Sequence, residues 1–215
     1  MKLAAFLDHT ILKPDTTTAD VVRICAEAKT HGFAAVCVPP FYVTQAKQEL
    51  QGQDVKLATV IGFPLGYAAT FSKVEEIKRA IDEGADEFDV VINIAAAKNA
   101  NWTFVRNEID RVIAACRMRA KTVKIILETG LLTEEEVRRL CDICNEFEPD
   151  FVKTSTGFNG PGASLVAVEL LRSCLKKDIK IKASGGIRDA ATAQAMIDAG
   201  ADRIGASASV AIVQG

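Results

Sequence analysis

The sequence has few of the residues from which proteins build metal centres. Only two histidines are present, His9 and His31, and they lie far apart along the chain. Cys141 and Cys144 form one C-x-x-C pair, but a zinc site of this type needs four converging ligands, and no second pair exists. Both cysteines fall at helical spacing with apolar neighbours. We therefore expect them to be small core residues, and we expect no metal and no other cofactor.

The sequence also has no strong excess of charge and no long apolar run. Its net charge is −2, which does not favour binding to nucleic acid or to an anionic membrane. No apolar stretch approaches the roughly 20 residues that a membrane-spanning helix needs. Met1 and Lys2 lead directly into a strand-like run, so no signal peptide is expected. These features predict a soluble, cytoplasmic protein that binds neither nucleic acid nor membranes.

There is no linker, low-complexity stretch or long run of one charge, so we expect a single domain over residues 1–215. Within it, strand-like and helix-like segments alternate from end to end. The strand-like runs are 6–12, 34–38, 56–63, 87–94, 123–128, 151–155, 179–184 and 203–206. The helix-like runs lie near 18–30, 40–50, 70–82, 101–119, 133–146, 163–176 and 189–198, with room for a short eighth after Ser207.

The alternation predicts an α/β fold with a parallel sheet, and eight units favour closure into an eight-stranded (β/α)8 TIM barrel. A doubly wound open sheet is the alternative, but no G-x-G-x-x-G follows the first strand. Thr133 with Glu136, and Ser72 with Glu75, have the spacing of capping boxes at helix starts. In a barrel, polar residues at the carboxyl ends of strands meet at one mouth, where catalysis takes place.

Charged residues inside predicted strands are the strongest functional signal. Lys153 lies within 151–157, Lys182 within 180–186 and Asp89 within 88–93. A lysine buried among cations and apolar groups loses its proton and becomes a nucleophile. We expect Lys182 to lower the pKa of Lys153, and Asp89 to bridge to Lys182 and act as an acid or base. Structural interpretations stay open: an irregular or exposed strand for either lysine, and a purely structural carboxylate for Asp89.

Glycine-rich loops follow the last two predicted strands. Gly185 and Gly186 come after the seventh strand, and Gly205 and Ser207 close the eighth. TIM barrels often bind phosphate at these two loops, where backbone N–H groups approach the anion closely. The turn at 156–157 is a candidate for the adjacent wall. The sequence therefore predicts a phosphate site beside the lysines.

Three other residues are weaker candidates. His31 precedes Gly32 at a helix end, where a cation complements the helix dipole. His9 follows Asp8 in the first strand, and alternation sends their side chains to opposite faces. Cys37 on the second strand is predicted to face the barrel interior, as a small core residue rather than a nucleophile.

Seven segments, in order, match one enzyme family. The chain resembles the deoxyribose-phosphate aldolases of bacterial type over nearly its whole length. The matching motifs are LDHTILKP at 7–14, VIGFPLG at 60–66, DVVINI at 89–94, ET at 128–129, VKTSTGF at 152–158, KASGGIR at 182–188 and RIGAS at 203–207. One departure is Ala208, which stands where some members have a second serine.

The resemblance implies a metal-free class I aldolase that reversibly cleaves 2-deoxy-D-ribose 5-phosphate to D-glyceraldehyde 3-phosphate and acetaldehyde, in deoxyribonucleoside catabolism. It implies that Lys153 forms the Schiff base, that Lys182 perturbs Lys153, and that Asp89 transfers protons. The residues expected to bind substrate are Asp8, Thr10, Cys37, Thr156, Gly157, Gly185, Gly186, Gly205 and Ser207. The partners would be sugar phosphates and aldehydes, and a homo-oligomer is compatible with this reading. The alternatives are another Schiff-base aldolase or transaldolase, and a non-catalytic phosphate-binding barrel.

Overall fold

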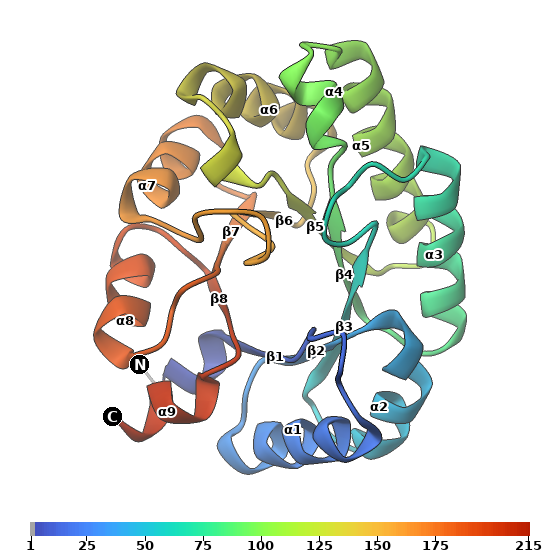
Figure 1. Ribbon diagram of the computed structural model, residues 1–215, viewed down its shortest axis with the longest axis vertical. Coiled ribbons are helices and arrows are strands. Elements are labelled where there is room, and N and C mark those ends of the chain that lie inside the picture. Colours follow the sequence, from blue (N-terminus) through green and yellow to red (C-terminus); the bar gives the residue numbers. More distant parts are fainter. Residues whose placement is uncertain (1–2) are drawn as a thin grey trace.

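The computed structural model describes residues 3–215, and Met1 and Lys2, on which the signal-peptide expectation rests, lie outside them. Eight parallel strands form a closed barrel in the order β1 to β8, which confirms the predicted fold and excludes the open sheet. Figure 1 shows the strands around the centre of the molecule and the helices in an outer layer. The strands are β1 (Leu7–Thr10), β2 (Ala35–Val38), β3 (Lys56–Ile61), β4 (Glu87–Val91), β5 (Thr122–Ile126), β6 (Phe151–Lys153), β7 (Lys180–Ser184) and β8 (Arg203–Ala206).

The helices follow the predicted pattern with one addition. The α-helices are α1 (Thr18–His31), α2 (Val43–Glu49), α3 (Thr70–Asp82), α4 (Ile94–Lys98), α5 (Trp102–Arg117), α6 (Glu134–Phe147), α7 (Leu165–Cys174), α8 (Ala190–Asp198) and α9 (Ser209–Gln214), and short 3-10 turns cover Leu3–Phe6, Pro40–Tyr42 and Thr129–Leu131. The short helix α4 was not predicted. It begins where we expected β4 to continue, because the Asn93 side chain accepts a hydrogen bond from the Ala96 N–H and caps a new helix.

Of the two capping boxes predicted at helix starts, one is present and one is not. Thr133 and Glu136 form the predicted capping box at α6. The capping box predicted for Ser72 and Glu75 is wrong, because α3 begins earlier, at Thr70, with no side-chain cap. The first turns of α3 include Lys73, whose buried ammonium bonds Glu108 on α5, a tertiary contact that local sequence signals do not report.

The barrel interior has an apolar side and a charged side. Small apolar residues of β2 and β3 form a separate buried cluster: Ala35, Cys37, Ala58 and Val60. Outside this cluster, β1 and β4 to β7 contribute buried charged residues: Asp8, Glu87, Asp89, Lys124, Lys153 and Lys182. Branched apolar side chains usually fill these layers in a TIM barrel. Burying ions here is costly unless they are paired, so the charged side points to a functional role.

The remaining sequence expectations concern cysteines and membranes. The predicted core cysteines of α6, Cys141 and Cys144, are both buried and free of disulfides. No helix within residues 3–215 is long and apolar enough to span a bilayer.

Candidate active site

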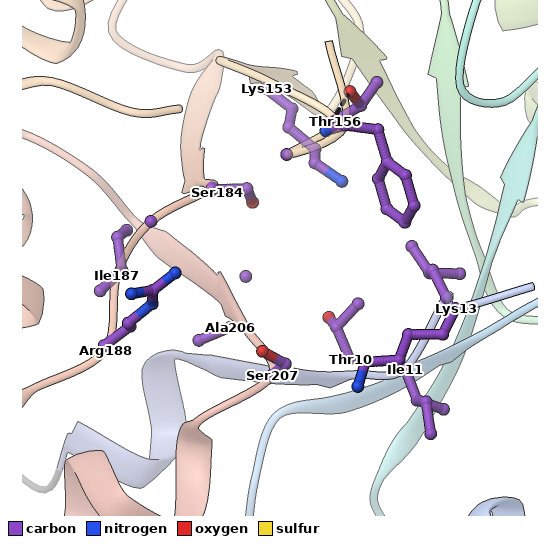
Figure 2. Close-up of a pocket in the computed structure, with 16 residues that line it drawn as sticks. Thr10, Ile11, Lys13, Lys153, Thr156, Ser184, Ile187, Arg188, Ala206 and Ser207 are labelled. Atoms are coloured by element: carbon purple, nitrogen blue, oxygen red, sulfur yellow. Dashed lines mark hydrogen bonds between the residues drawn. The ribbon is translucent and has the colours of Figure 1, made fainter. Parts of the chain in front are cut away.

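A cavity of about 290 Å³ opens over the carboxyl ends of β1, β6, β7 and β8. Its walls come from the last residues of these strands, Lys153 at the end of β6 among them, and from the loops that follow (Figure 2). The lining residues are Thr10, Ile11, Leu12, Lys13, Lys153, Thr156, Gly157, Phe158, Ser184, Gly185, Gly186, Ile187, Arg188, Gly205, Ala206 and Ser207. The cavity therefore lies where TIM barrels place their chemistry.

Lys153 joins this cavity to the charged interior. Its side chain is 4% exposed, and its Nζ lies 2.7 Å from Asp89 Oδ2. Figure 2 shows the amine at the tip of the side chain directed into the cavity. Burial lowers the pKa of Lys153 below its ordinary value; the Asp89 carboxylate opposes this change and the Lys182 ammonium reinforces it. The surroundings of Lys153 thus favour its neutral amine more than water does.

The Asp89 carboxylate accepts hydrogen bonds from three lysines, each on a different strand. Its Oδ1 accepts from Lys124 at 2.8 Å, and its Oδ2 accepts from Lys153 at 2.7 Å and from Lys182 at 2.8 Å. Burial alone would raise the pKa of Asp89, but the three lysines hold it well below its usual range. The predicted contact between Asp89 and Lys182 is confirmed. Asp89 is therefore ionised and can accept a proton.

Lys182 lies between two carboxylates, Asp89 and Asp8, and donates a hydrogen bond to each. Burial disfavours its charge, but the two carboxylates outweigh burial and raise the pKa of Lys182. Asp8 was predicted to bind substrate. The structure instead places it below the cavity, fully buried, where it also accepts from Arg203 at 2.6 Å.

Three members of this charge cluster were missed from the sequence. Lys124 is fully buried and bonds Asp89, and its Nζ lies 2.6 Å from Glu87 Oε2. Arg203 bonds Asp8 and lies 3.5 Å from Glu87. For Lys124 the signal was available, since it stands between Val123 and Ile125 in a predicted strand, as Lys153 does in its own. Glu87 and Arg203 each open a strand, where charge normally meets solvent.

Most predicted substrate-binding residues line the cavity, among them Thr10, Thr156, Gly157, Gly185, Gly186, Gly205 and Ser207. Gly186 has φ +82°, and a Cβ there would meet no atom within 4 Å, so its backbone is open to a ligand. Lys13 and Arg188 also line the cavity. These two cations were not predicted as site residues from the sequence, and they would complement a bound anion.

Cys37 does not line the cavity; it is fully buried in the apolar cluster, and burial raises the pKa of its thiol to about 11.

Glu128 has φ +62°, a strained backbone for a side chain of this size, and its carboxylate accepts from the Thr156 N–H at 3.0 Å and from the Thr156 hydroxyl. It holds the loop after β6 against the cavity.

Comparison with known proteins agrees with this geometry. The model of the DeoC/LacD family aldolases matches residues 2–215. Deoxyribose-phosphate aldolase 1 of Oceanobacillus iheyensis is 49% identical over 215 residues, all of this chain and 97% of the relative. The deoxyribose-phosphate aldolase of Clostridium tetani is 49% identical over 214 residues, covering 100% of this chain and 99% of its own.

Solved aldolase structures are also similar to this chain in backbone fold. The aldolase QR15 superposes with a TM-score of 0.94 at 40% identity, over 100% of this chain and 95% of its own. The tetrameric deoxyribose phosphate aldolase from Aeropyrum pernix superposes with a TM-score of 0.93 at 34% identity, over 99% of this chain and 89% of its own. The chain belongs to the DeoC/LacD family of aldolases.

Proposed function

We propose that this barrel is a class I aldolase that reversibly cleaves 2-deoxy-D-ribose 5-phosphate to D-glyceraldehyde 3-phosphate and acetaldehyde. One observation carries the proposal. Of the charged side chains clustered in the interior, Lys153 is the member that lines the cavity, and its surroundings favour the neutral amine. A neutral amine at the floor of a polar cavity is the requirement for Schiff-base chemistry.

The first half of the reaction forms the covalent intermediate. The Lys153 amine attacks the C1 carbonyl of the open-chain sugar, and the nitrogen gives up a proton to Asp89, which lies 2.7 Å away. Asp89 passes this proton to the C1 oxygen, so a C1 hydroxyl forms and the Asp89 carboxylate is restored. Lys182 is held in its charged form by Asp8 and Asp89, so it can supply the proton with which the C1 hydroxyl leaves as water. The product is an iminium ion, whose positive charge is balanced by the Asp89 carboxylate.

The second half breaks the carbon chain. The iminium withdraws electrons from the C2–C3 bond as a base removes the C3 hydroxyl proton, so D-glyceraldehyde 3-phosphate leaves and an enamine remains. Protonation of the enamine at C2 and hydrolysis then release acetaldehyde and free Lys153. The 5-phosphate would bind at Gly186 and Ser207, with Arg188 and Lys13 as counter-charges. Holding the substrate in this way can contribute about 7–11 kcal/mol.

Reductive trapping tests the proposal. Borohydride added with acetaldehyde should attach one two-carbon group, and peptide mapping should find it at Lys153. Trapping at Lys182 would reverse the two assigned roles. No trapping at either lysine would favour the non-catalytic phosphate-binding barrel. A panel of sugar phosphates separates deoxyribose-phosphate aldolase from another Schiff-base aldolase or a transaldolase.

The cellular setting follows from the same proposal. Cleavage of deoxyribose 5-phosphate would serve deoxyribonucleoside catabolism in the cytoplasm, without nucleic acid as a partner. A tetramer is named for the Aeropyrum pernix relative. Assembly of this chain into a homo-oligomer stays a prediction, to be measured by analytical ultracentrifugation.

A further inference from the structure

The interior charges form a closed ring. Starting from Asp89, successive ion pairs lead to Lys182, then Asp8, then Arg203. From Arg203 they continue to Glu87, then Lys124, and back to Asp89. Negative and positive groups alternate at every step. We call these six residues, Asp89, Lys182, Asp8, Arg203, Glu87 and Lys124, the ion ring.

The ion ring spans the barrel from the cavity to the opposite end. Asp89 contacts Lys153 beneath the cavity. Arg203 is the first residue of β8 and Glu87 the first of β4, so both lie at the amino-terminal ends of their strands, away from the cavity. Their side chains are 16% and 7% exposed, whereas the other four are 0–1% exposed. Only the far end of the ring therefore reaches solvent.

The charges of the ring balance without Lys153. Three carboxylates face three cations, so the ring is neutral, and a protonated Lys153 would add an uncompensated positive charge to a dry interior. The other groups around Lys153 do not supply a counter-charge. Burial keeps the Cys37 thiol on β2 neutral, and the β3 residues of the interior cluster, Ala58 and Val60, are apolar. The buried Glu128 carboxylate is bonded to Thr156, and Lys13 and Arg188 in the cavity are further cations.

We propose that Arg203 and Glu87, at the end of the barrel remote from the cavity, are positioning residues that set the protonation state of Lys153 through the ion ring. This rests on the proposed role of Lys153 as the Schiff-base lysine. Removing Arg203 leaves an excess negative charge that a protonated Lys153 can balance. Removing Glu87 leaves an excess positive charge that a protonated Lys153 would increase. The two residues must therefore act in opposite directions.

The test is the pH dependence of Lys153 trapping by acetaldehyde and cyanoborohydride. Two unit charges about 10 Å apart at an effective dielectric of about 20 shift a pKa by about one unit. The midpoint is the pH at which the trapping rate reaches half its maximum. Arg203→Gln should move this midpoint up by about one pH unit, and Glu87→Gln should move it down by a similar amount. The double variant should return towards the parent midpoint. A purely structural role would slow trapping without opposite shifts.

Lys180→Gln is the matched control. Lys180 begins β7 at the same end of the barrel, and its Nζ lies 5.5 Å from the centroid of the Phe151 ring, as Arg203 lies 5.4 Å from it. It is exposed and outside the ion ring, so its removal should leave the midpoint in place.

Failure of the proposed function and failure of the ion-ring inference give different results. If the parent protein is not trapped at Lys153, the proposed function fails. If Lys153 is trapped but the two neutral variants share the parent midpoint, or shift in the same direction, the inference is overturned. Should the neutral variants not fold, Arg203→Lys and Glu87→Asp retain the charges and must retain the midpoint; a shift in either rejects the role of charge.

Discussion

Gly205 lies directly against the side chain of Lys182. A Cβ at position 205 would come within 2.9 Å of Lys182 Cε and 2.3 Å of Ser184 Oγ. The register of β7 on β8 fixes this approach, since Ser184 pairs with Gly205 and Lys182 with Arg203. Gly205 lines the cavity as predicted, but the lack of a side chain also makes room for Lys182 to reach Asp8 and Asp89.

Gly205→Ala should therefore slow the catalytic steps more than it weakens substrate binding. The added methyl group displaces Lys182 from its carboxylates, and overpacking of this kind costs about 1–3 kcal/mol of stability. We expect kcat for deoxyribose 5-phosphate to fall while KM changes little. Steady-state kinetics and urea unfolding measure the two effects. Unchanged kcat in a folded variant would show that Lys182 does not depend on this space.

Asp89→Asn should separate the protonation of Lys153 from proton transfer. The Asp89 carboxylate raises the pKa of Lys153, so its neutral replacement should lower that pKa and move the trapping midpoint to lower pH. Turnover should nevertheless fall by roughly 10²–10⁴-fold, because a general base is lost. The comparison uses trapping rates and kcat on the same variant. A midpoint that moves to higher pH would contradict the assigned electrostatics.

The sequence was sufficient to predict that Lys153, Lys182 and Asp89 lie together in the barrel interior, because each interrupts a predicted strand with charge. It was not sufficient to find Glu87 and Arg203. At the start of a strand a charge usually meets solvent, as Lys180 does, and alternation gives the face of a residue but not its neighbours on other strands.

The register between strands determines which residues become neighbours across the sheet, and the alternation of side chains along one strand does not. Pairing places Asp89 opposite Lys124, Lys153 opposite Lys182, and Lys182 opposite Arg203. These pairings bring residues from far-apart segments into the ion ring and place Lys153 beside it, which a single sequence cannot specify. The capping error at Ser72 lies beside another tertiary contact that the sequence does not show, the ion pair of Lys73 on α3 with Glu108 on α5.

Activity should not depend on a metal ion. In the proposed reaction the iminium is the electron sink, so no Lewis acid is required. Among residues 3–215, no three His, Cys, Asp or Glu side chains are grouped to hold a metal ion. Dialysis against EDTA should leave the cleavage rate unchanged. A loss of activity that zinc restores would overturn the class I assignment.

Lys73 on α3 and Glu108 on α5 form a further buried ion pair, outside the barrel. The Lys73 ammonium donates to Glu108 at 2.8 Å and to the Val91 carbonyl at 2.7 Å, and Glu108 accepts from the Asn93 N–H. Glu108→Leu leaves a buried ammonium unpaired and should cost about 3–5 kcal/mol in unfolding free energy. Glu75→Leu, which breaks an exposed pair with Lys78, is the control and should cost below about 1 kcal/mol. Equal losses would show that burial of the pair is unimportant.

The phosphate site gives the last prediction. Gly186→Asp would project a carboxylate into the open space beside Arg188, where the 5-phosphate is proposed to bind. Like-charge repulsion should raise KM for deoxyribose 5-phosphate strongly and affect unphosphorylated deoxyribose much less, since the latter has no group to place there.

Gly186→Ala separates charge from backbone strain in this experiment. Both variants force a side chain onto φ +82°, but only aspartate adds a negative charge. If alanine raises KM for the phosphorylated substrate as much as aspartate does, strain explains the effect. If both substrates suffer equally from aspartate while the variant stays folded, the phosphate does not bind at this loop. A selective effect of aspartate alone would place the dianion beside Gly186.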